Sequence, residues 1–299
     1  MQPKNILITG GTGLIGNHLL ELFEEKKYHS AVLSRKPGSE NSFQWDLDKK
    51  YIDPNAFENT DTIIHLAGAS LADGRWTAKR KQEIIESRVK STELLYDQLK
   101  NNSHNVKTFI SSSAIGIYGD TGENWVTENS LPANDFLAGV CIEWEKAAEK
   151  ISSLGIRVVI IRTGIVLAKE GGALPVLSIP VKYFIGSPLG SGKQYQSWIH
   201  INDLCAIYLD AIEDEKMNGA YNAVASNPVT QKSFMQTLAK TLRRPLLPVH
   251  VPPWILKIVL GQKAEMILSG QRVSNKKLLD SGFQFKFNQL DQALKEIVQ

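Results

Sequence analysis

NILITGGTGLIGNHLLELF, residues 5–23, is the stretch that decides the fold. An apolar run typical of a buried strand leads into a glycine-rich turn, and the turn opens an amphipathic helical pattern over residues 14–27. Gly10 permits a tight turn, Gly13 lets the backbone approach a pyrophosphate, and Gly16 lets helix and strand pack closely. The free N–H groups of such a helix start attract phosphate. The stretch predicts a dinucleotide site, with a ligand-free glycine turn as the alternative, and its candidate contacts are Gly10, Thr12, Gly13, Leu14, Ile15 and Gly16.

The same alternation of strand and helix continues through the first half of the chain. Runs rich in Val and Ile read as strands that are buried on both faces. Helical patterns with one apolar face lie between them, and Gly155 suits a left-handed helix end. We therefore predict an α/β fold, a Rossmann-type doubly wound parallel sheet. The expected strands are 5–9, 30–34, 61–68, 107–114 and 157–167, and the expected helices are 14–27, 78–100 and 137–153.

The pattern changes after residue 169, where glycines and prolines interrupt every period. Residues 197–214 return to a strand followed by a helix, and the tail from 271 reads as a helix, a short strand and a last helix. We predict a smaller C-terminal α+β lobe over the carboxyl edge of the sheet, where ligands of such folds bind. The expected division is 1–169 plus 199–224 for the Rossmann domain, and 170–198 plus 225–299 for the smaller lobe.

Composition excludes several classes of protein. The chain has 299 residues, is 42% apolar and carries a net charge of +3, which suits a packed core and argues against a nucleic-acid partner. The start lacks a secretion signal, and no apolar run is long enough to cross a membrane. Two cysteines and six scattered histidines predict a cytoplasmic location and no metal site.

The end of the second strand indicates which dinucleotide is bound. An NAD site would place a carboxylate near residue 34 or 35 for the ribose hydroxyls. The chain has Ser34 and Arg35 there, and a guanidinium can pair with a 2′-phosphate, so NADP(H) is predicted in preference to NAD(H). A solvated surface Arg–Lys pair is the alternative. Further candidate cofactor contacts are Asp46 and Leu47 near the adenine, and Leu66, Ala67 and Gly68 after the third strand.

Several motifs resemble one known superfamily. GGTGLIG (10–16), HLAGA (65–69), SSSAIGIYG (111–119) and WIHINDL (198–204) resemble the extended short-chain dehydrogenases/reductases. Residues 75–89, 111–128, 135–148 and 251–287 are similar in detail to an atypical branch, the YfcH-like NAD(P)-dependent epimerase family proteins. This resemblance covers nearly the whole chain. It implies a Rossmann domain, bound NADP(H), a small carbonyl or sugar-like substrate, and a homodimer as one option.

The family's catalytic residues carry over only in part. In sugar-nucleotide epimerases a serine polarises the substrate oxygen, and Ser113 falls at that position. A tyrosine that moves the proton and a lysine four residues later would fall at Leu137 and Cys141, upstream of the matching helix Glu145. Leucine cannot transfer a proton and cysteine cannot supply a fixed positive charge. The usual acid/base pair is therefore absent.

Other residues are candidates for the missing roles, and each also has a structural interpretation. Tyr118 could reach the nicotinamide or simply pack beside a turn. Arg88 could meet the cofactor or the substrate, or be solvated. Cys141 could be a nucleophile or a small buried residue. Arg75 and Arg162 are candidate substrate contacts.

Three further predictions concern residues outside this group. His200 reads as structural, bonding near Asp203. The hydroxyls of residues 111–113 could be turn chemistry alone. A diphosphate substrate would need Arg243, Arg244 and Arg272 to converge on the site.

Two functional hypotheses follow. The first is an NADP(H)-dependent oxidoreductase or epimerase, with Ser113 holding the carbonyl oxygen and Tyr118 or water supplying the proton. The second is an NADP(H)-binding regulator or scaffold without turnover.

Overall fold

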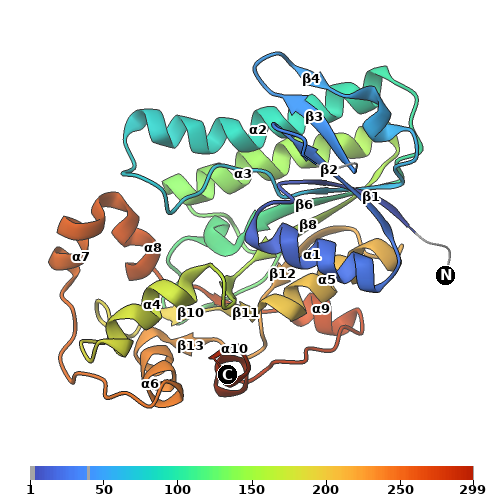
Figure 1. The fold of residues 1–299 in the computed structure, drawn as a ribbon. Helices are drawn as coiled ribbons and strands as arrows, with labels where there is room; N and C mark the ends of the chain where they lie inside the picture. Colours follow the sequence, from blue (N-terminus) through green and yellow to red (C-terminus); the bar gives the residue numbers. More distant parts are fainter. Residues whose placement is uncertain (1–3, 39–40, 299) are drawn as a thin grey trace.

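The centre of the protein is a mostly parallel sheet (Figure 1). The structure is a computed structural model that describes residues 4–38 and 41–298. Within these residues the sheet has eight strands in the order β12-β8-β6-β5-β1-β2-β3-β4, and only the pair β3–β4 is antiparallel. Its strands are β1 (Asn5–Thr9), β2 (His29–Ser34), β3 (Ser42–Asp46), β4 (Tyr51–Ile52), β5 (Thr62–His65), β6 (Thr108–Ala114), β8 (Arg157–Thr163) and β12 (Gly219–Ala223).

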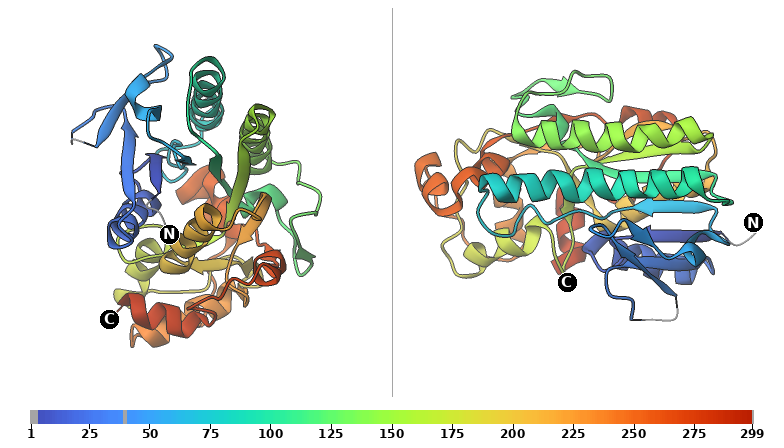
Figure 2. Two further views of the ribbon diagram at one scale, coloured as in Figure 1. Left: turned by 90° about the vertical axis from the view of Figure 1, so that its right-hand side faces the viewer. Right: turned by 90° about the horizontal axis from the view of Figure 1, so that it is seen from above.

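Helices cover both faces of the sheet, which confirms the predicted Rossmann-type α/β class. Helices α1 (Leu14–Glu25) and α5 (Ile201–Glu213) bury their apolar sides on one face, against β1, β6 and β8. Helices α2 (Ala78–Asn101) and α3 (Phe136–Glu149) lie side by side over the other face (Figure 2). The chain crosses from one face to the other at β1, so the glycine turn after β1 lies at the point where the strand order reverses.

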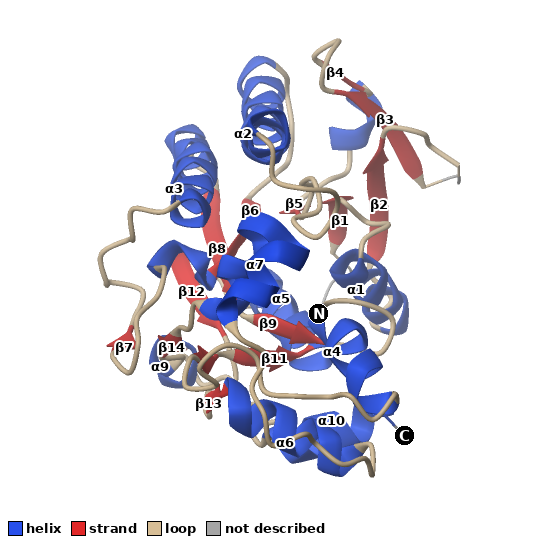
Figure 3. Cartoon of the chain, turned by 90° about the vertical axis from the view of Figure 1, so that its left-hand side faces the viewer, coloured by secondary structure: helices blue, strands red, loops and turns tan. Residues whose placement is uncertain are grey.

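A third apolar core lies beyond the carboxyl ends of the strands. Figure 3 looks toward that edge and shows α4 and α7 in front of the sheet. The elements there are β7 (Trp125–Val126), β9 (Ile165–Leu167), α4 (Ala173–Lys182), β10 (Tyr195–Gln196), β11 (Trp198–His200), β13 (Val229–Thr230), α6 (Gln231–Thr241), α7 (Pro253–Leu260), α8 (Glu265–Leu268), β14 (Arg272–Val273), α9 (Lys276–Asp280) and α10 (Leu290–Val298). Short 3-10 helices are η1 (Pro54–Phe57), η2 (Ile115–Tyr118), η3 (Lys150–Leu154) and η4 (Gly261–Ala264).

The strand predicted over 157–167 is wrong in its length. It breaks at Gly164, and β9 leaves the main sheet to pair with β11. A Cβ at Gly164 would lie 2.5 Å from the carbonyl oxygen of Ser197, so only glycine allows the two backbones to approach this closely. The break brings Thr163 and Ile165 to the carboxyl edge of the sheet.

The short strand predicted in the tail is also wrong. Residues 282–287 form no strand, because the N–H groups of Lys286 and Phe287 donate to the Asp203 carboxylate, both at 2.9 Å. His200 caps α5 by accepting from Asn202 N–H, and its Nε2 lies 2.9 Å from Glu296. His200 is thus structural, as predicted, but its carboxylate partner is Glu296.

Three other findings bear on the predictions. The helical segment 136–154 ends at Gly155 with φ 78°, which confirms the predicted left-handed end. No helix among residues 4–38 and 41–298 is long and apolar enough to cross a membrane. The described part of the chain also holds no group of three or more His, Cys, Asp or Glu side chains that could bind a metal.

Candidate functional site: a cavity at the carboxyl edge of the sheet

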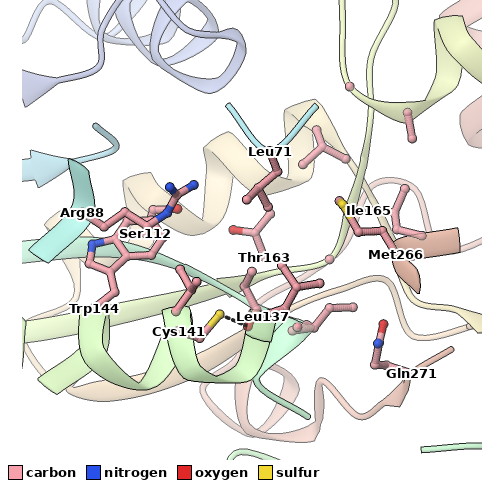
Figure 4. Close-up of a pocket in the computed structure, with 18 of the residues that line it drawn as sticks. Leu71, Arg88, Ser112, Leu137, Cys141, Trp144, Thr163, Ile165, Met266 and Gln271 are labelled. Atoms are coloured by element: carbon pink, nitrogen blue, oxygen red, sulfur yellow. Dashed lines mark hydrogen bonds between the residues drawn. The ribbon is translucent and has the colours of Figure 1, made fainter. Parts of the chain in front are cut away.

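A cavity of about 570 Å³ lies where the sheet meets the segments beyond its carboxyl edge. The glycine turn and the start of α1 form one wall, and α3 forms another. The remaining walls come from residues 163–173, from Gln196 and from the region around α8. The cavity therefore joins the predicted dinucleotide site to residues far along the chain. Figure 4 shows part of its lining, with Arg88 and Trp144 on one side and Met266 and Gln271 on the other.

The glycine turn has the geometry that the sequence predicts. Gly10 has φ 71°, and its carbonyl accepts from the Gly13 N–H at 3.0 Å to close the turn. A Cβ at Gly16 would lie only 2.6 Å from the Gly10 oxygen, so the close packing of helix and turn leaves room for glycine alone at this position. Helix α1 starts at Leu14 without a side-chain cap, and Gly13, Leu14, Ile15 and Gly16 line the cavity. Its unpaired N–H groups fit the pyrophosphate of a dinucleotide.

A buried histidine, His65, is hydrogen-bonded to the strand residue Thr9 that precedes this turn. The Thr9 hydroxyl lies 2.7 Å from His65 Nδ1 and accepts from the Leu66 and Ala67 N–H groups. The Ser91 hydroxyl donates to the carbonyls of residues 87 and 88, so it is left to accept from His65 Nε2–H. Burial lowers the pKa of His65 to about 3, so the ring is neutral and each of its nitrogens has a partner.

The predicted contacts for the rest of the dinucleotide lie at the carboxyl ends of β2, β3 and β5. Ser34 ends β2, next to β1, and its hydroxyl bonds within the following turn, while Arg35 is exposed. Asp46 ends β3, and its carboxylate accepts from the backbone N–H groups of residues 48 and 49. Leu66 lines the cavity, and the backbone of residues 66–67 lies against Gly10. Thr12, Ser34, Arg35, Asp46, Leu47, Ala67 and Gly68 do not line the cavity itself.

Among the described residues, Arg88 is the only lysine or arginine that lines the cavity. Its guanidinium lies over the Trp144 ring, 5.1 Å from the ring centre, and contacts the backbone of Gly68. One nitrogen, Nη1, donates to the carbonyls of Ala69 and Ile84. Burial lowers the pKa of Arg88, and nearby Cys141 partly opposes this shift. In the described part of the chain the Trp144 Nε1 donor, which is buried beside Arg88, has no hydrogen-bond partner.

Two predicted catalytic residues and one predicted substrate contact lie outside the cavity. Ser113 is buried and donates to Glu145, and Tyr118 donates to Asn222 at 2.7 Å. Arg162 forms a bidentate pair with Glu145, at 2.9 and 2.8 Å, and also donates to Tyr118. These groups satisfy one another behind the cavity wall. Ser113, Tyr118 and Arg162 therefore do not line this cavity, and a direct role for them in catalysis or substrate binding stays a prediction.

The ionisation of this buried cluster agrees with a structural role. Burial raises the pKa of Tyr118, although Arg162 and Asn222 oppose the shift. Burial alone would lower the pKa of Arg162, but the bonds and charge of Glu145 raise it. Neither group exchanges a proton near neutral pH. The remaining substrate candidate, Arg75, is exposed and does not line the cavity.

Helix α3 presents apolar groups where the acid/base pair would lie. Leu137 and Cys141 both line the cavity, four residues apart. Burial raises the pKa of the Cys141 thiol to about 11, and its sulfur donates to the Ala114 carbonyl at 3.6 Å. Cys141 is thus a neutral thiol packed against the wall, and the structure favours the interpretation of a small buried residue.

Sequence reasoning missed several polar groups that the cavity contains. Ser112 places a hydroxyl-bearing side chain on its wall, and Gln271 reaches it from beyond the sheet. Gln196 also lines it. The alternation of a strand could have suggested Ser112, because neighbours in β6 face opposite sides. Nothing local marks the glutamines, since their position depends on the packing of distant segments.

A Rossmann sheet with an uncapped glycine turn at its switch point defines a dinucleotide-binding protein of the α/β class. The comparison with known families is more particular: residues 6–223 match the NAD dependent epimerase/dehydratase family, and the chain belongs to that family. Residues 251–297 match a domain of unknown function, DUF1731.

Two relatives and one solved structure match the chain over nearly its whole length. The chain is 37% identical to epimerase family protein SAR0825 of Staphylococcus aureus over 302 residues, 99% of each chain. It is 37% identical to epimerase family protein YfhF of Bacillus subtilis, covering 98% of each. The crystal structure of human epimerase family protein SDR39U1 with NADPH superposes with a TM-score of 0.89 at 30% identity, covering 98% of each chain.

Proposed function

We propose that this protein binds NADP(H) in preference to NAD(H) and acts as an oxidoreductase or epimerase on a small carbonyl or sugar-like compound. One observation carries the proposal: the uncapped start of α1 and the polar groups Arg88, Ser112 and Thr163 line the same cavity. A phosphate-binding helix start and polar side chains thus share one cavity. The NADPH bound to human SDR39U1 supports the choice of cofactor.

The residues present fit a nicotinamide dinucleotide. Gly13 carries no side chain at the start of α1, where a pyrophosphate would approach, and Arg35 lies at the strand end where a 2′-phosphate would be met. When bound, the reduced cofactor supplies a hydride. The chain itself would place a positive charge at the cavity through Arg88, and hydroxyl groups through Ser112 and Thr163.

The source of the proton differs from that in the usual family pattern. Leu137 and Cys141 cannot provide it, and Tyr118 is engaged behind the wall. A water molecule held by the cavity's hydroxyl and amide groups is the donor we propose. Lys263 donates to the Ala72 carbonyl at 2.8 Å, which ties the segment before α8 to the loop before α2 and helps to limit solvent entry.

A second candidate function also has support. The cavity lacks the tyrosine and lysine of the family pattern, so a protein that binds NADP(H) without turnover would show the same wall of α3. One assay distinguishes the two candidate functions. Oxidation of bound NADPH by carbonyl compounds above background favours the enzyme, and binding without oxidation favours the regulator.

Titration with NADPH and NADH tests the cofactor proposal. We expect NADPH to bind more tightly, and Arg35→Ala to weaken NADPH by about 1–3 kcal/mol, roughly 5- to 150-fold, with little effect on NADH. The control is Arg244→Ala, an exposed arginine whose guanidinium lies over the Phe184 ring. Equal binding of both nucleotides, unchanged in Arg35→Ala, would contradict the preference. If neither nucleotide binds, the function itself is wrong.

A further inference from the structure

The charged groups around the cavity are arranged unevenly. Among the described residues that line it, only Arg88, Asp135 and Glu265 are charged. Arg88 lies at the dinucleotide side, against Gly68 and Trp144. Asp135 and Glu265 border the side toward α3 and α8. Away from Arg88, a ligand therefore meets carboxylates and no cation.

The arginines that could have held a diphosphate are engaged elsewhere. Arg272 stacks between Trp125 and Tyr195, with its guanidinium carbon 4.5 and 4.7 Å from the two ring centres. Arg244 lies over Phe184, and Arg243 is exposed in the loop that follows α6. None of the three lines the cavity, so the convergence that a diphosphate substrate requires does not occur.

The wall beyond the dinucleotide turn is mainly apolar. Its polar side chains are few, and the amide of Gln271 already donates to the Gly119 carbonyl at 2.7 Å. Lys263 joins the segment before α8 to the loop that carries Leu71, and Leu71 lines this part of the cavity. Desolvating an anion here would be costly, whereas an apolar body would gain by burial. The apolar lining is Leu71, Trp76, Phe136, Leu137, Val140, Ile165, Val166 and Met266.

We infer that the substrate is an uncharged, mainly apolar ketone or aldehyde, or the matching alcohol, and not a nucleoside diphosphate sugar. The inference rests on the proposed function and specifies its substrate class. In the reducing direction a hydride from NADPH forms the new C–H bond at the carbonyl carbon. The C=O π bond breaks, the oxygen takes a proton from water, and the products are an alcohol, NADP⁺ and hydroxide.

The test uses the full chain in three steps. NADPH binding is measured first, because its failure would remove the proposed function and this inference together. Calorimetry on the NADP⁺-loaded protein then compares acetophenone, 4-carboxyacetophenone and UDP-glucose. The two acetophenones share a ring and a ketone and differ by one carboxylate. NADPH oxidation is finally followed with the same compounds.

The inference predicts a clear order. Acetophenone should bind at least tenfold more tightly than its carboxylated analogue, and UDP-glucose should show no binding. Replacing Glu265 by lysine should shift the ratio toward the carboxylated analogue by about fivefold, because a cation then borders the cavity. UDP-glucose binding more tightly than acetophenone would overturn the inference. So would normal NADP⁺ binding with no binding of acetophenone.

A matched pair of leucine variants tests whether the apolar wall of the cavity binds acetophenone. Leu137→Gln, inside the cavity, should weaken acetophenone binding about tenfold while NADPH affinity stays unchanged, because an apolar contact is lost. Leu131→Gln makes the same chemical change at a side chain that is 88% exposed and outside the cavity, and should alter neither. Equal effects of the two variants would overturn the assignment of this wall to the substrate.

Discussion

The helices α1 and α3 both begin at the cavity, but their first turns differ. Helix α1 has no side-chain cap, and glycine precedes it. Helix α3 is capped by Asp135, whose carboxylate accepts from the Ala138 N–H at 2.9 Å. Thr77, His200 and Thr230 cap α2, α5 and α6 in the same way. The first N–H groups of α1 are therefore open to water or to a bound anion, whereas Asp135 occupies one of those at the start of α3.

The same contrast extends to the chemistry of the two regions. Around α1 the sequence keeps every feature that a dinucleotide needs. Along α3 the positions of the family's tyrosine and lysine hold Leu137 and Cys141, and the neighbouring Glu145 turns inward to a buried cluster. The chain thus keeps the glycine turn of the family and lacks the tyrosine and lysine of its acid/base pair. The catalytic step, where there is one, depends on residues other than the family pair.

The largest expected effect comes from breaking the cluster behind α3. Arg162→Met leaves the buried Glu145 carboxylate without its cation, and we expect the free energy of unfolding to fall by about 3–5 kcal/mol. Denaturant titration measures this change. The double variant Arg162→Met, Glu145→Leu should recover much of the loss. A stable Arg162→Met protein that has lost only substrate binding would contradict the structural role.

A smaller effect tests the support beneath α1. The pKa of His65 is about 3 in the folded protein and 6.5 is its usual value, so between these pH values the unfolded chain binds a proton that the folded chain does not. Stability from this group is complete above pH 6.5 and falls as the pH drops toward 3. The slope is about 1.4 kcal/mol per pH unit, or about 2 kcal/mol lost at pH 5.

His65→Gln provides the comparison for this pH effect, because an amide keeps a donor and an acceptor but does not titrate. Unfolding of both proteins is measured at pH 7 and pH 5. The difference between them isolates His65 from other groups, including His200, whose pKa burial also lowers. Parallel pH profiles for the two proteins would show that His65 does not stay neutral in the fold.

The sequence predicts the region around α1 well because its requirements are local. Gly10 must adopt a positive φ, and Gly16 must let the backbone of the turn approach closely. Both requirements can be inferred from the seven residues 10–16. The strand break at Gly164 was missed because its cause, the Ser197 carbonyl, lies more than thirty residues away. The tail strand failed for the same reason, since Asp203 takes its N–H groups.

The region around α3 could be predicted only in part. The absence of the tyrosine and lysine is plain in the sequence, but the consequence for Ser113 is not. In a strand a shift of one residue moves a side chain to the other face, so Ser112 lines the cavity and Ser113 bonds to Glu145. The arginines follow the same logic, because Arg162 lies seventeen residues from its carboxylate partner along the chain.

The smallest effect separates ligand binding from folding at α1. Gly13 has φ −81°, which any residue adopts, and a Cβ there would meet only the Gly10 oxygen, at 3.2 Å. Gly13→Ala should therefore change stability by less than about 1 kcal/mol. It should nevertheless weaken NADPH binding about tenfold, near 1.4 kcal/mol, because the methyl group stands where the pyrophosphate approaches.

Gly139→Ala is the matched control on α3. A Cβ at Gly139 has no neighbour within 4 Å, so alanine should stabilise the helix by about 0.5–1 kcal/mol and leave NADPH binding unchanged. Thermal unfolding and NADPH titration of both variants complete the comparison. If Gly13→Ala binds NADPH as the wild type does, the open start of α1 does not hold the pyrophosphate. The contrast between the two helices would then concern stability alone, and the cofactor would have to bind through the residues around Arg88.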